Sequence, residues 1–178
     1  QWQQGLGGDL HGKTLAILGL GSIGKRVAQF GQVFGMRVIA WSENLTAETA
    51  AEVGVTYVSK QELFEQADVL SVHLVLSERS RGLVDAQALA WMKPTALLVN
   101  TARGPIVDEA ALIKALQKNR LAGAALDVFE VEPLPEHHPF RTLENVLATP
   151  HVGYVSRQNY QMFFSQMIED IQAWSAGK

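Results

Sequence analysis

Short apolar runs alternate along this chain with longer segments whose apolar residues recur at helical spacing. Each run is short enough to form a buried strand, and the runs lie at residues 15–18, 36–41, 55–58, 68–74, 96–100, 121–127 and 145–148. Helical patterns begin near residues 22, 46, 59, 85 and 108, between successive runs. This alternation predicts βαβ units and a parallel sheet.

The first run leads into a glycine-rich turn. Residues 19–24 read GLGSIG, and a helical pattern follows with four apolar side chains on one face: Ile23, Val27, Phe30 and Phe34. Gly19 permits the tight turn, Gly21 lets the backbone approach a pyrophosphate, and Gly24 allows close packing of helix on strand. This context favours a dinucleotide site over a purely structural turn. The predicted fold is a three-layer α/β structure, a Rossmann-type doubly wound parallel sheet.

Several residues mark the expected ends of helices. Gly35 stands where the first helix should stop. Ser59 and Glu62 have the spacing of a capping box, and Asp85 and Asp108 are expected N-caps.

The C-terminal stretch carries an apolar stripe at helical spacing. Its members are Tyr160, Phe163, Phe164, Met167, Ile168, Ile171 and Trp174. Such spacing is typical of a helix that packs on a core, and we expect packing here rather than cofactor binding. We divide the chain into a linker (1–12), a dinucleotide-binding domain (13–153) and a C-terminal amphipathic helix (154–178).

Composition narrows the possible functions. The 178 residues suffice for one domain with a substantial core, and the net charge of −3 gives no electrostatic footprint for nucleic acid or an anionic membrane. The absence of cysteine excludes disulfides, thiolate metal sites and cysteine nucleophiles, and fits a reducing compartment such as the cytoplasm. No metal site is expected. The abrupt start at Gln1 suggests that the natural N-terminus lies further upstream.

Polar residues stand where the predicted strands end, the edge at which open parallel sheets bind ligands. They are Ser42, His73, residues 100–103 with Arg103, Asp127 with Glu132 beyond it, and His151. An arginine, a carboxylate and a histidine beside a nicotinamide would suit hydride transfer to a carbonyl. The arginine orients a substrate carboxylate, the histidine supplies a proton, and the carboxylate orients the histidine.

Several of these residues also have a simpler interpretation. Arg103 could bridge a helix terminus, and Asp127 and Glu132 could be ordinary loop carboxylates. His73 is expected to have a structural role, or to lie along the backbone, rather than to act as an acid or base. His137 and His138, in a proline-rich loop, are expected to be solvated.

Four motifs in order resemble the D-isomer-specific 2-hydroxyacid dehydrogenases. They are residues 19–24 (GLGSIG), 99–109 (VNTARGPIVDE), 125–133 (ALDVFEVEP) and 149–153 (TPHVG). The resemblance covers only the nucleotide-binding domain, so it implies a substrate domain outside this chain. It also implies a homodimer and a small 2-oxo or 2-hydroxy acid as substrate.

The resemblance implies a role for individual residues. Arg103 resembles the catalytic arginine that binds the substrate carboxylate, Glu132 the carboxylate paired with the catalytic histidine, and His151 that histidine. The resemblance also implies cofactor contacts by Gly19, Gly21, Ser22, Ile23, Gly24, Ser42, Glu43, His73, Leu74, Thr101, Ala102, Arg103, Asp127, His151, Gly153 and Tyr154.

Three positions depart from the family pattern. Ser42 stands where an aspartate usually binds the ribose, and Glu43 follows it with no cation until Lys60. A carboxylate would repel a 2′-phosphate, so we expect NAD, with NADP as the alternative. Leu74 is followed by Val75 where a proline is common, and Tyr154 replaces a small residue and could narrow the pocket or touch the substrate.

The sequence therefore predicts an NAD(P)-binding domain of an oxidoreductase that interconverts 2-oxo and D-2-hydroxy acids. An NAD(H)-sensing corepressor of the same fold is the alternative. Without its substrate domain, the isolated chain is expected to bind cofactor but to have little or no turnover.

Overall fold

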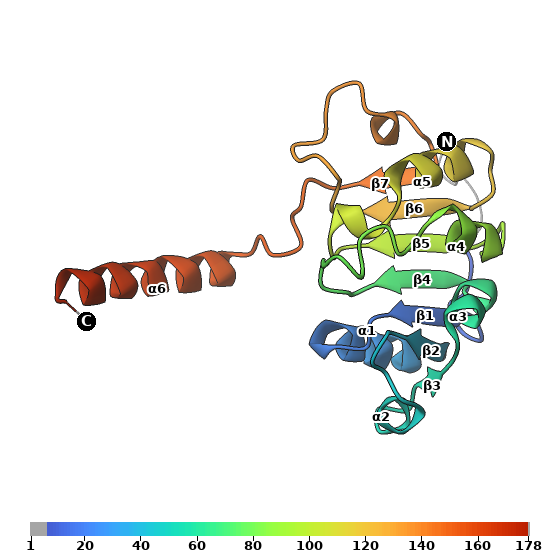
Figure 1. Ribbon diagram of the computed structural model, residues 1–178, viewed down its shortest axis with the longest axis horizontal. Helices are drawn as coiled ribbons and strands as arrows, with labels where there is room; N and C mark the ends of the chain where they lie inside the picture. Colours follow the sequence, from blue (N-terminus) through green and yellow to red (C-terminus); the bar gives the residue numbers. More distant parts are fainter. Residues whose placement is uncertain (1–6, 178) are drawn as a thin grey trace.

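The computed structural model describes residues 7–177 and contains one seven-stranded parallel sheet (Figure 1). The strand order is β3-β2-β1-β4-β5-β6-β7. The strands are β1 (Thr14–Leu18), β2 (Arg37–Trp41), β3 (Thr56–Tyr57), β4 (Val69–Val72), β5 (Leu97–Asn100), β6 (Gly123–Leu126) and β7 (Val146–Ala148). All seven predicted strands are present, and the predicted α/β fold with a parallel sheet is confirmed.

Helices connect successive strands. They are α1 (Ser22–Val33), α2 (Ala47–Ala51), α3 (Lys60–Gln66), α4 (Ala86–Trp91), α5 (Glu109–Gln117) and α6 (Arg157–Ser175), with short 3-10 helices η1 (Gly104–Ile106) and η2 (Pro139–Arg141). Because the strands are parallel, their carboxyl ends all meet at one edge of the sheet.

The predicted helix ends are confirmed by the capping contacts. Ser59 Oγ accepts the N–H of Glu62 while Glu62 Oε2 accepts the N–H of Ser59, as in a capping box. Asp85 and Asp108 cap α4 and α5, each accepting a backbone N–H of the first turn. Gly35, with φ of 71°, follows the end of α1 in the left-handed conformation typical of glycine at that position.

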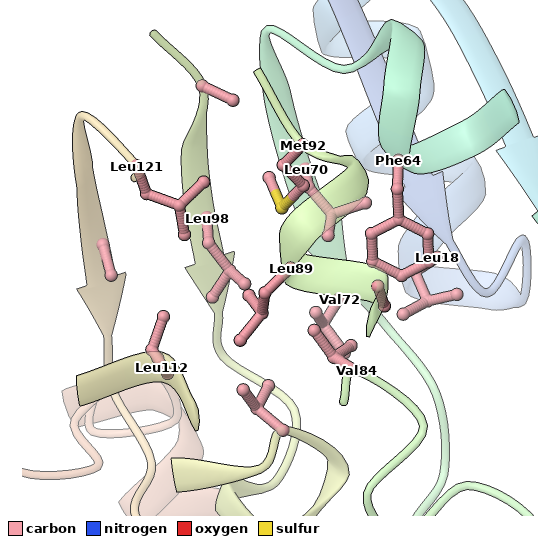
Figure 2. Packing of buried hydrophobic residues seen from close by; sticks show 14 of the residues in the cluster. Leu18, Phe64, Leu70, Val72, Val84, Leu89, Met92, Leu98, Leu112 and Leu121 are labelled. Carbon is pink, nitrogen blue, oxygen red and sulfur yellow. The ribbon is translucent and has the colours of Figure 1, made fainter. Parts of the chain in front are cut away.

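One face of the sheet is covered by α3, α4 and α5. Figure 2 shows Phe64, Leu89 and Leu112 from these helices packed against side chains of the strands. The strand residues in this cluster include Leu18, Leu70, Val72 and Leu98, all buried. This packing fixes the strands whose ends carry the candidate site.

The opposite face is covered by α1 over β1 and β2. Most of the apolar helix face identified from the sequence is exposed: Ile23 and Phe30 remain 67% and 64% exposed, and only Val27 is half-buried and packs against the core. The buried face of α1 consists of Gly24, Ala28 and Gly31. A side chain at Gly31 would collide with Leu15, so small residues are what lets this helix approach the sheet so closely.

The same face is bare over β5, β6 and β7 within residues 7–177. Leu97 and Leu147 alternate with core residues along their strands, so they point away from the covered face, and they are 45% and 66% exposed. Parallel sheets are normally buried on both faces. Within the described residues, the second helical layer therefore covers β1 and β2 but not β5, β6 and β7.

Helix α6 does not pack on the domain. It follows β7 in the chain and extends away from the sheet on the side of the strands' carboxyl ends (Figure 1), and none of its described residues is buried. The predicted helix is confirmed, but the expectation that its apolar stripe faces the core is wrong for the described chain. Ile171 and Trp174, for example, are 63% and 80% exposed.

Of the predicted linker 1–12, residues 1–6 lie outside the described residues, and residues 7–12 are exposed and contain no helix or strand. Within the described part of the chain, no helix is long and apolar enough to cross a membrane.

Candidate active site

The glycine turn lies between the carboxyl end of β1 and the start of α1. Gly19 has φ of 103°, and a Cβ there would lie 2.9 Å from the carbonyl of His73. A Cβ on Gly24 would lie 2.1 Å from Gly19 O, so both positions require glycine. Gly21, in contrast, faces open space, because a Cβ there would meet no atom within 4 Å. This open side is where a phosphate can approach the backbone.

The N-terminus of α1 begins at this turn and is suited to an anion. Its N-cap, Gly21, has no side chain to accept a hydrogen bond, and the first turn contains no acidic residue. The N–H groups of Ser22 and Ile23 therefore remain available, together with the positive end of the helix dipole. Both features fit a dinucleotide pyrophosphate.

Ser42 and Glu43 follow β2 at the same edge. Ser42 is half-buried, and its carbonyl accepts the N–H of Leu45, while Glu43 is exposed. The short turn that these residues form leaves both side chains at the surface beside the end of β2. They are placed where the ribose of a dinucleotide is expected.

His73 follows β4, and its backbone N–H donates to Leu18 O over 2.8 Å. Its Nε2 lies 2.8 Å from Ser71 Oγ, and burial lowers the pKa of the imidazole. The ring is therefore neutral near neutral pH, which agrees with a structural role. Leu74 closes over the turn, because its Cδ2 atom would lie 2.9 Å from a Cβ on Gly19.

A buried asparagine shapes the turn that carries Arg103. The Asn100 side chain is 1% exposed; its Oδ1 accepts the N–H of Ala102, and its Nδ2 donates to Arg103 O, each over 3.0 Å. Arg103 is exposed, and its guanidinium donates to Ala102 O over 2.6 Å. No carboxylate of the described residues pairs with it, so most of its donors can receive a substrate carboxylate.

Glu132 and His151 form a direct pair. Oε2 of Glu132 lies 2.7 Å from Nδ1 of His151, and Oε1 accepts the N–H of Phe129 over 3.0 Å. Both side chains are about one-third exposed. Because Nδ1 is bound to the carboxylate, Nε2 is the ring nitrogen left to meet a ligand.

The pKa of Glu132 lies below its ordinary value. Burial raises the pKa of this carboxyl, but the hydrogen bonds from His151 and the Phe129 N–H, and the positive charges of His151 and Arg103, outweigh that burial. The carboxylate is thus ionised at neutral pH and can stabilise a protonated His151.

Asp127 holds the backbone that carries His151. The carboxylate is 7% exposed and accepts hydrogen bonds from the Thr149 hydroxyl and from the N–H groups of Val152 and Gly153. Burial raises the pKa of Asp127, and these hydrogen bonds together with the charge of His151 lower it below its ordinary value. His151 lies between these bonds with φ of 53°. The hydrogen bonds to the Asp127 carboxylate therefore hold His151 in a backbone conformation that is otherwise unfavourable.

Tyr154 packs edge-on against His151, with ring centroids 5.6 Å apart at an interplanar angle of 88°. It is 47% exposed. The ring therefore borders the space beside the imidazole, as a residue that narrows a substrate pocket would.

The structure thus brings several of the residues selected from the sequence into contact: Gly19 with His73 and Leu74, Glu132 with His151, and Asp127 with Gly153.

One expectation about the histidines is wrong. His138 is not solvated: its side chain is 13% exposed and pairs with Glu109. His137 is exposed as predicted. Within residues 7–177, no group of three or more potential ligand side chains is placed to hold a metal.

Sequence reasoning assigns no specific role to two residues of the site. Asn100 and Thr149 lie within the motifs 99–109 and 149–153, but nothing in the sequence shows that Asn100 shapes the Arg103 turn or that Thr149 donates to Asp127. A buried polar residue that directly follows an apolar run is the signal that could have identified Asn100.

Comparisons with known proteins agree with this geometry. The family model described as "D-isomer specific 2-hydroxyacid dehydrogenase, NAD binding domain" matches residues 1–153. The chain is 45% identical over 173 residues to glyoxylate reductase of Aeropyrum pernix, covering 97% of this chain and 52% of that protein. The chain thus spans about half the length of this curated relative.

Solved structures show the same relationship. A phosphoglycerate oxidoreductase from Vibrio cholerae O395 superposes with a TM-score of 0.92 at 44% identity, covering 98% of this chain and 56% of that one. D-lactate dehydrogenase from Aquifex aeolicus, complexed with NAD and lactic acid, gives a TM-score of 0.85 at 31% identity, covering 98% and 57%. The chain therefore belongs to the D-isomer-specific 2-hydroxyacid dehydrogenase family and is an NAD-binding domain of that family.

Proposed function

We propose that the whole protein that contains this domain is an oxidoreductase that interconverts a 2-oxo acid and a D-2-hydroxy acid. Arg103, Glu132 and His151 are its catalytic residues. The relatives named above are enzymes of this kind, which favours an enzyme over an NAD(H)-sensing corepressor of the same fold.

The hydrogen bond between Glu132 and His151 carries this proposal. The carboxylate fixes the tautomer and orientation of the ring and stabilises the imidazolium. In the direction of reduction, His151 then donates the proton on Nε2 to the carbonyl oxygen of the 2-oxo acid. In the direction of oxidation, the neutral ring accepts the hydroxyl proton at the same nitrogen.

Arg103 binds the substrate carboxylate. The exposed guanidinium has donors that no carboxylate of the described chain occupies, and Asn100 fixes its backbone. A two-point contact with the substrate carboxylate orients the neighbouring carbonyl toward His151.

The residues of the glycine turn fit NAD, since Gly21 leaves open space at a helix N-terminus that has no acidic residue in its first turn. The backbone of residues 21–23 would hold the pyrophosphate, Ser42 and Glu43 the ribose, and residues 101–103, Asp127, Gly153 and Tyr154 the nicotinamide side. NADH, when bound, supplies the hydride. His73, neutral and adjacent to Gly19, lines the turn without adding charge.

A substrate screen of the full-length protein tests the proposal. NADH oxidation would be followed with glyoxylate, pyruvate and phosphohydroxypyruvate as substrates. Any chiral hydroxy acid that forms would be analysed by enantioselective chromatography. We expect turnover with at least one 2-oxo acid and a D-hydroxy acid as product. An L-hydroxy acid, or NADH binding without turnover of any 2-oxo acid, would contradict the proposal.

We also infer that the full-length protein is a homodimer, as the family resemblance implies. Phe30, Val33 and Phe34 form an exposed apolar group at the end of α1, with Val33 83% exposed, and such groups support association. Light scattering coupled to size exclusion should give twice the mass of the full-length chain; a monomer mass would contradict this inference.

A further inference from the structure

A second histidine–carboxylate pair lies near the catalytic one. His138 Nε2 is 3.0 Å from Glu109 Oε1, and the two side chains are 13% and 21% exposed. The N–H of Phe140 donates to His138 Nδ1 over 3.2 Å, so Nδ1 is an acceptor and Nε2 carries the ring proton. His138 therefore donates to Glu109 in one fixed tautomer.

The same carboxylate contacts the loop at a second point. Glu109 Oε2 accepts the N–H of Glu130 over 3.3 Å. Glu109 begins α5, whereas Glu130 and His138 lie on either side of Glu132 in the loop after β6. One side chain thus ties both flanks of the loop that carries Glu132 to the start of a helix.

The loop also touches the segment that carries Arg103. A Cβ on Gly104 would lie 2.0 Å from the carbonyl carbon of Phe129 and 2.6 Å from Glu130 N, so the two backbones are in direct contact. Residues 103–109 therefore meet the loop at Gly104 and again at Glu109. These two contacts hold the segment that contains Arg103 against the loop that contains Glu132.

We propose that Glu109 and His138 are positioning residues that hold the Glu132 loop so that its carboxylate meets His151 Nδ1 beside Arg103. The pair acts through Glu132 and does not itself contact substrate. Its effect on turnover rests on the dehydrogenase activity proposed above, whereas its effect on the Glu132–His151 contact does not.

His138→Phe tests this pair in the full-length protein. Phenylalanine keeps an aromatic ring near Phe140, whose centroid lies 4.9 Å from that of His138, but removes the donor to Glu109. His138→Gln restores an N–H at the position of Nε2. His137→Phe is the matched control, because His137 is exposed and no hydrogen bond of its side chain occurs among the described residues.

We expect kcat to fall about tenfold in His138→Phe, because displacements of about 1 Å at a catalytic group carry penalties of this order or larger. His138→Gln should stay within about twofold of the wild type, and the Kd for NADH should be unchanged in both, since the glycine turn lies on other elements. A lower melting temperature with unchanged kcat would show a merely structural role and overturn the proposal. Loss of kcat that His138→Gln does not restore would also overturn it.

Crystal structures of the variants give a readout that does not depend on activity. The separation of Glu132 Oε2 and His151 Nδ1 should exceed hydrogen-bond distance in His138→Phe and return in His138→Gln. An intact pair in His138→Phe would refute the positioning role even if the enzyme proved inactive on all 2-oxo acids. If His138→Phe does not fold, Glu109→Gln, which turns one acceptor oxygen into a donor, provides the same comparison.

Discussion

The carboxylate of Asp127 accepts the backbone N–H of Gly153 over 2.9 Å, two residues beyond His151. Together with the bond from Val152, this contact holds the chain around His151 in its left-handed conformation. Asp127 therefore contributes to the site by fixing the backbone of His151, the proposed catalytic histidine, in addition to its own proposed role near the nicotinamide.

Asp127→Asn should destabilise the protein by about 1–3 kcal/mol. The amide can accept with only one of its two heteroatoms, so at least one of the three donors loses its partner at this buried side chain. Urea denaturation of the full-length protein measures this change. Asp9→Asn, at an exposed position, is the control and should leave the midpoint unchanged; a wild-type midpoint for Asp127→Asn would contradict this account.

The strands and the helix caps could be predicted from sequence because their signals are local. A capping box depends on residues three positions apart, and Ser59 and Glu62 form it as expected. A short apolar run between polar turns is likewise sufficient to identify a buried parallel strand such as β5.

The errors concern partners that are distant in sequence. Solvent exposure is expected for His138 because nothing near it indicates Glu109, 29 residues earlier. In α1, the sequence pattern shows which apolar residues share a face but does not show that the small residues, such as Gly31, form the buried face. The stripe of α6 is apolar as a core helix would be, but sequence periodicity does not tell which surface it covers.

Two glycines of the turn should respond differently to alanine. Gly24→Ala should destabilise the protein by about 1–3 kcal/mol, because its Cβ would overlap Gly19 O. Gly21→Ala should lower stability less than Gly24→Ala, because alanine is a poorer N-cap than glycine but meets no atom here. It should weaken NADH binding, because its methyl group enters the open space proposed for the pyrophosphate. Thermal unfolding and fluorescence titration with NADH separate the two effects.

Gly8→Ala is the control for this pair, since a Cβ there meets no atom closer than 4.0 Å. Undiminished NADH affinity in Gly21→Ala would place the pyrophosphate elsewhere.

Glu43 should make the protein prefer NADH over NADPH. A carboxylate near the ribose 2′-position repels a phosphate by about 1 kcal/mol even in water at about 4 Å, which corresponds to about fivefold in affinity. Glu43→Gln should reduce the NADH/NADPH affinity ratio by about this factor, measured by fluorescence titration. Glu52→Gln, also exposed, should not change the ratio, and tighter NADPH binding by the wild type would disprove the charge argument.

Glu132 should add stability that disappears in acid. Its pKa in the folded protein lies below the ordinary value of 4.5, so the ionised form stabilises the fold at and above that pH. As the pH falls through the lowered pKa, the carboxylate is protonated and this contribution is lost. The difference in unfolding free energy between wild type and Glu132→Gln should therefore shrink as the pH falls below 4.5.

Urea denaturation at several pH values measures this difference. Glu136→Gln is the matched control from the same loop, at an exposed position. A difference for Glu132→Gln that does not change with pH would show that the carboxylate is not held by its contacts with His151 and the Phe129 N–H.

The most direct test of the account is the kcat of His151→Gln in the full-length enzyme, measured with NADH and the best 2-oxo acid, beside His137→Gln as control. Removal of a general acid should lower kcat by about 10²- to 10⁴-fold while NADH affinity is retained, and the control should match the wild type. A His151→Gln enzyme with wild-type kcat would show that the proton comes from another group and would contradict the proposed role of the Glu132–His151 pair.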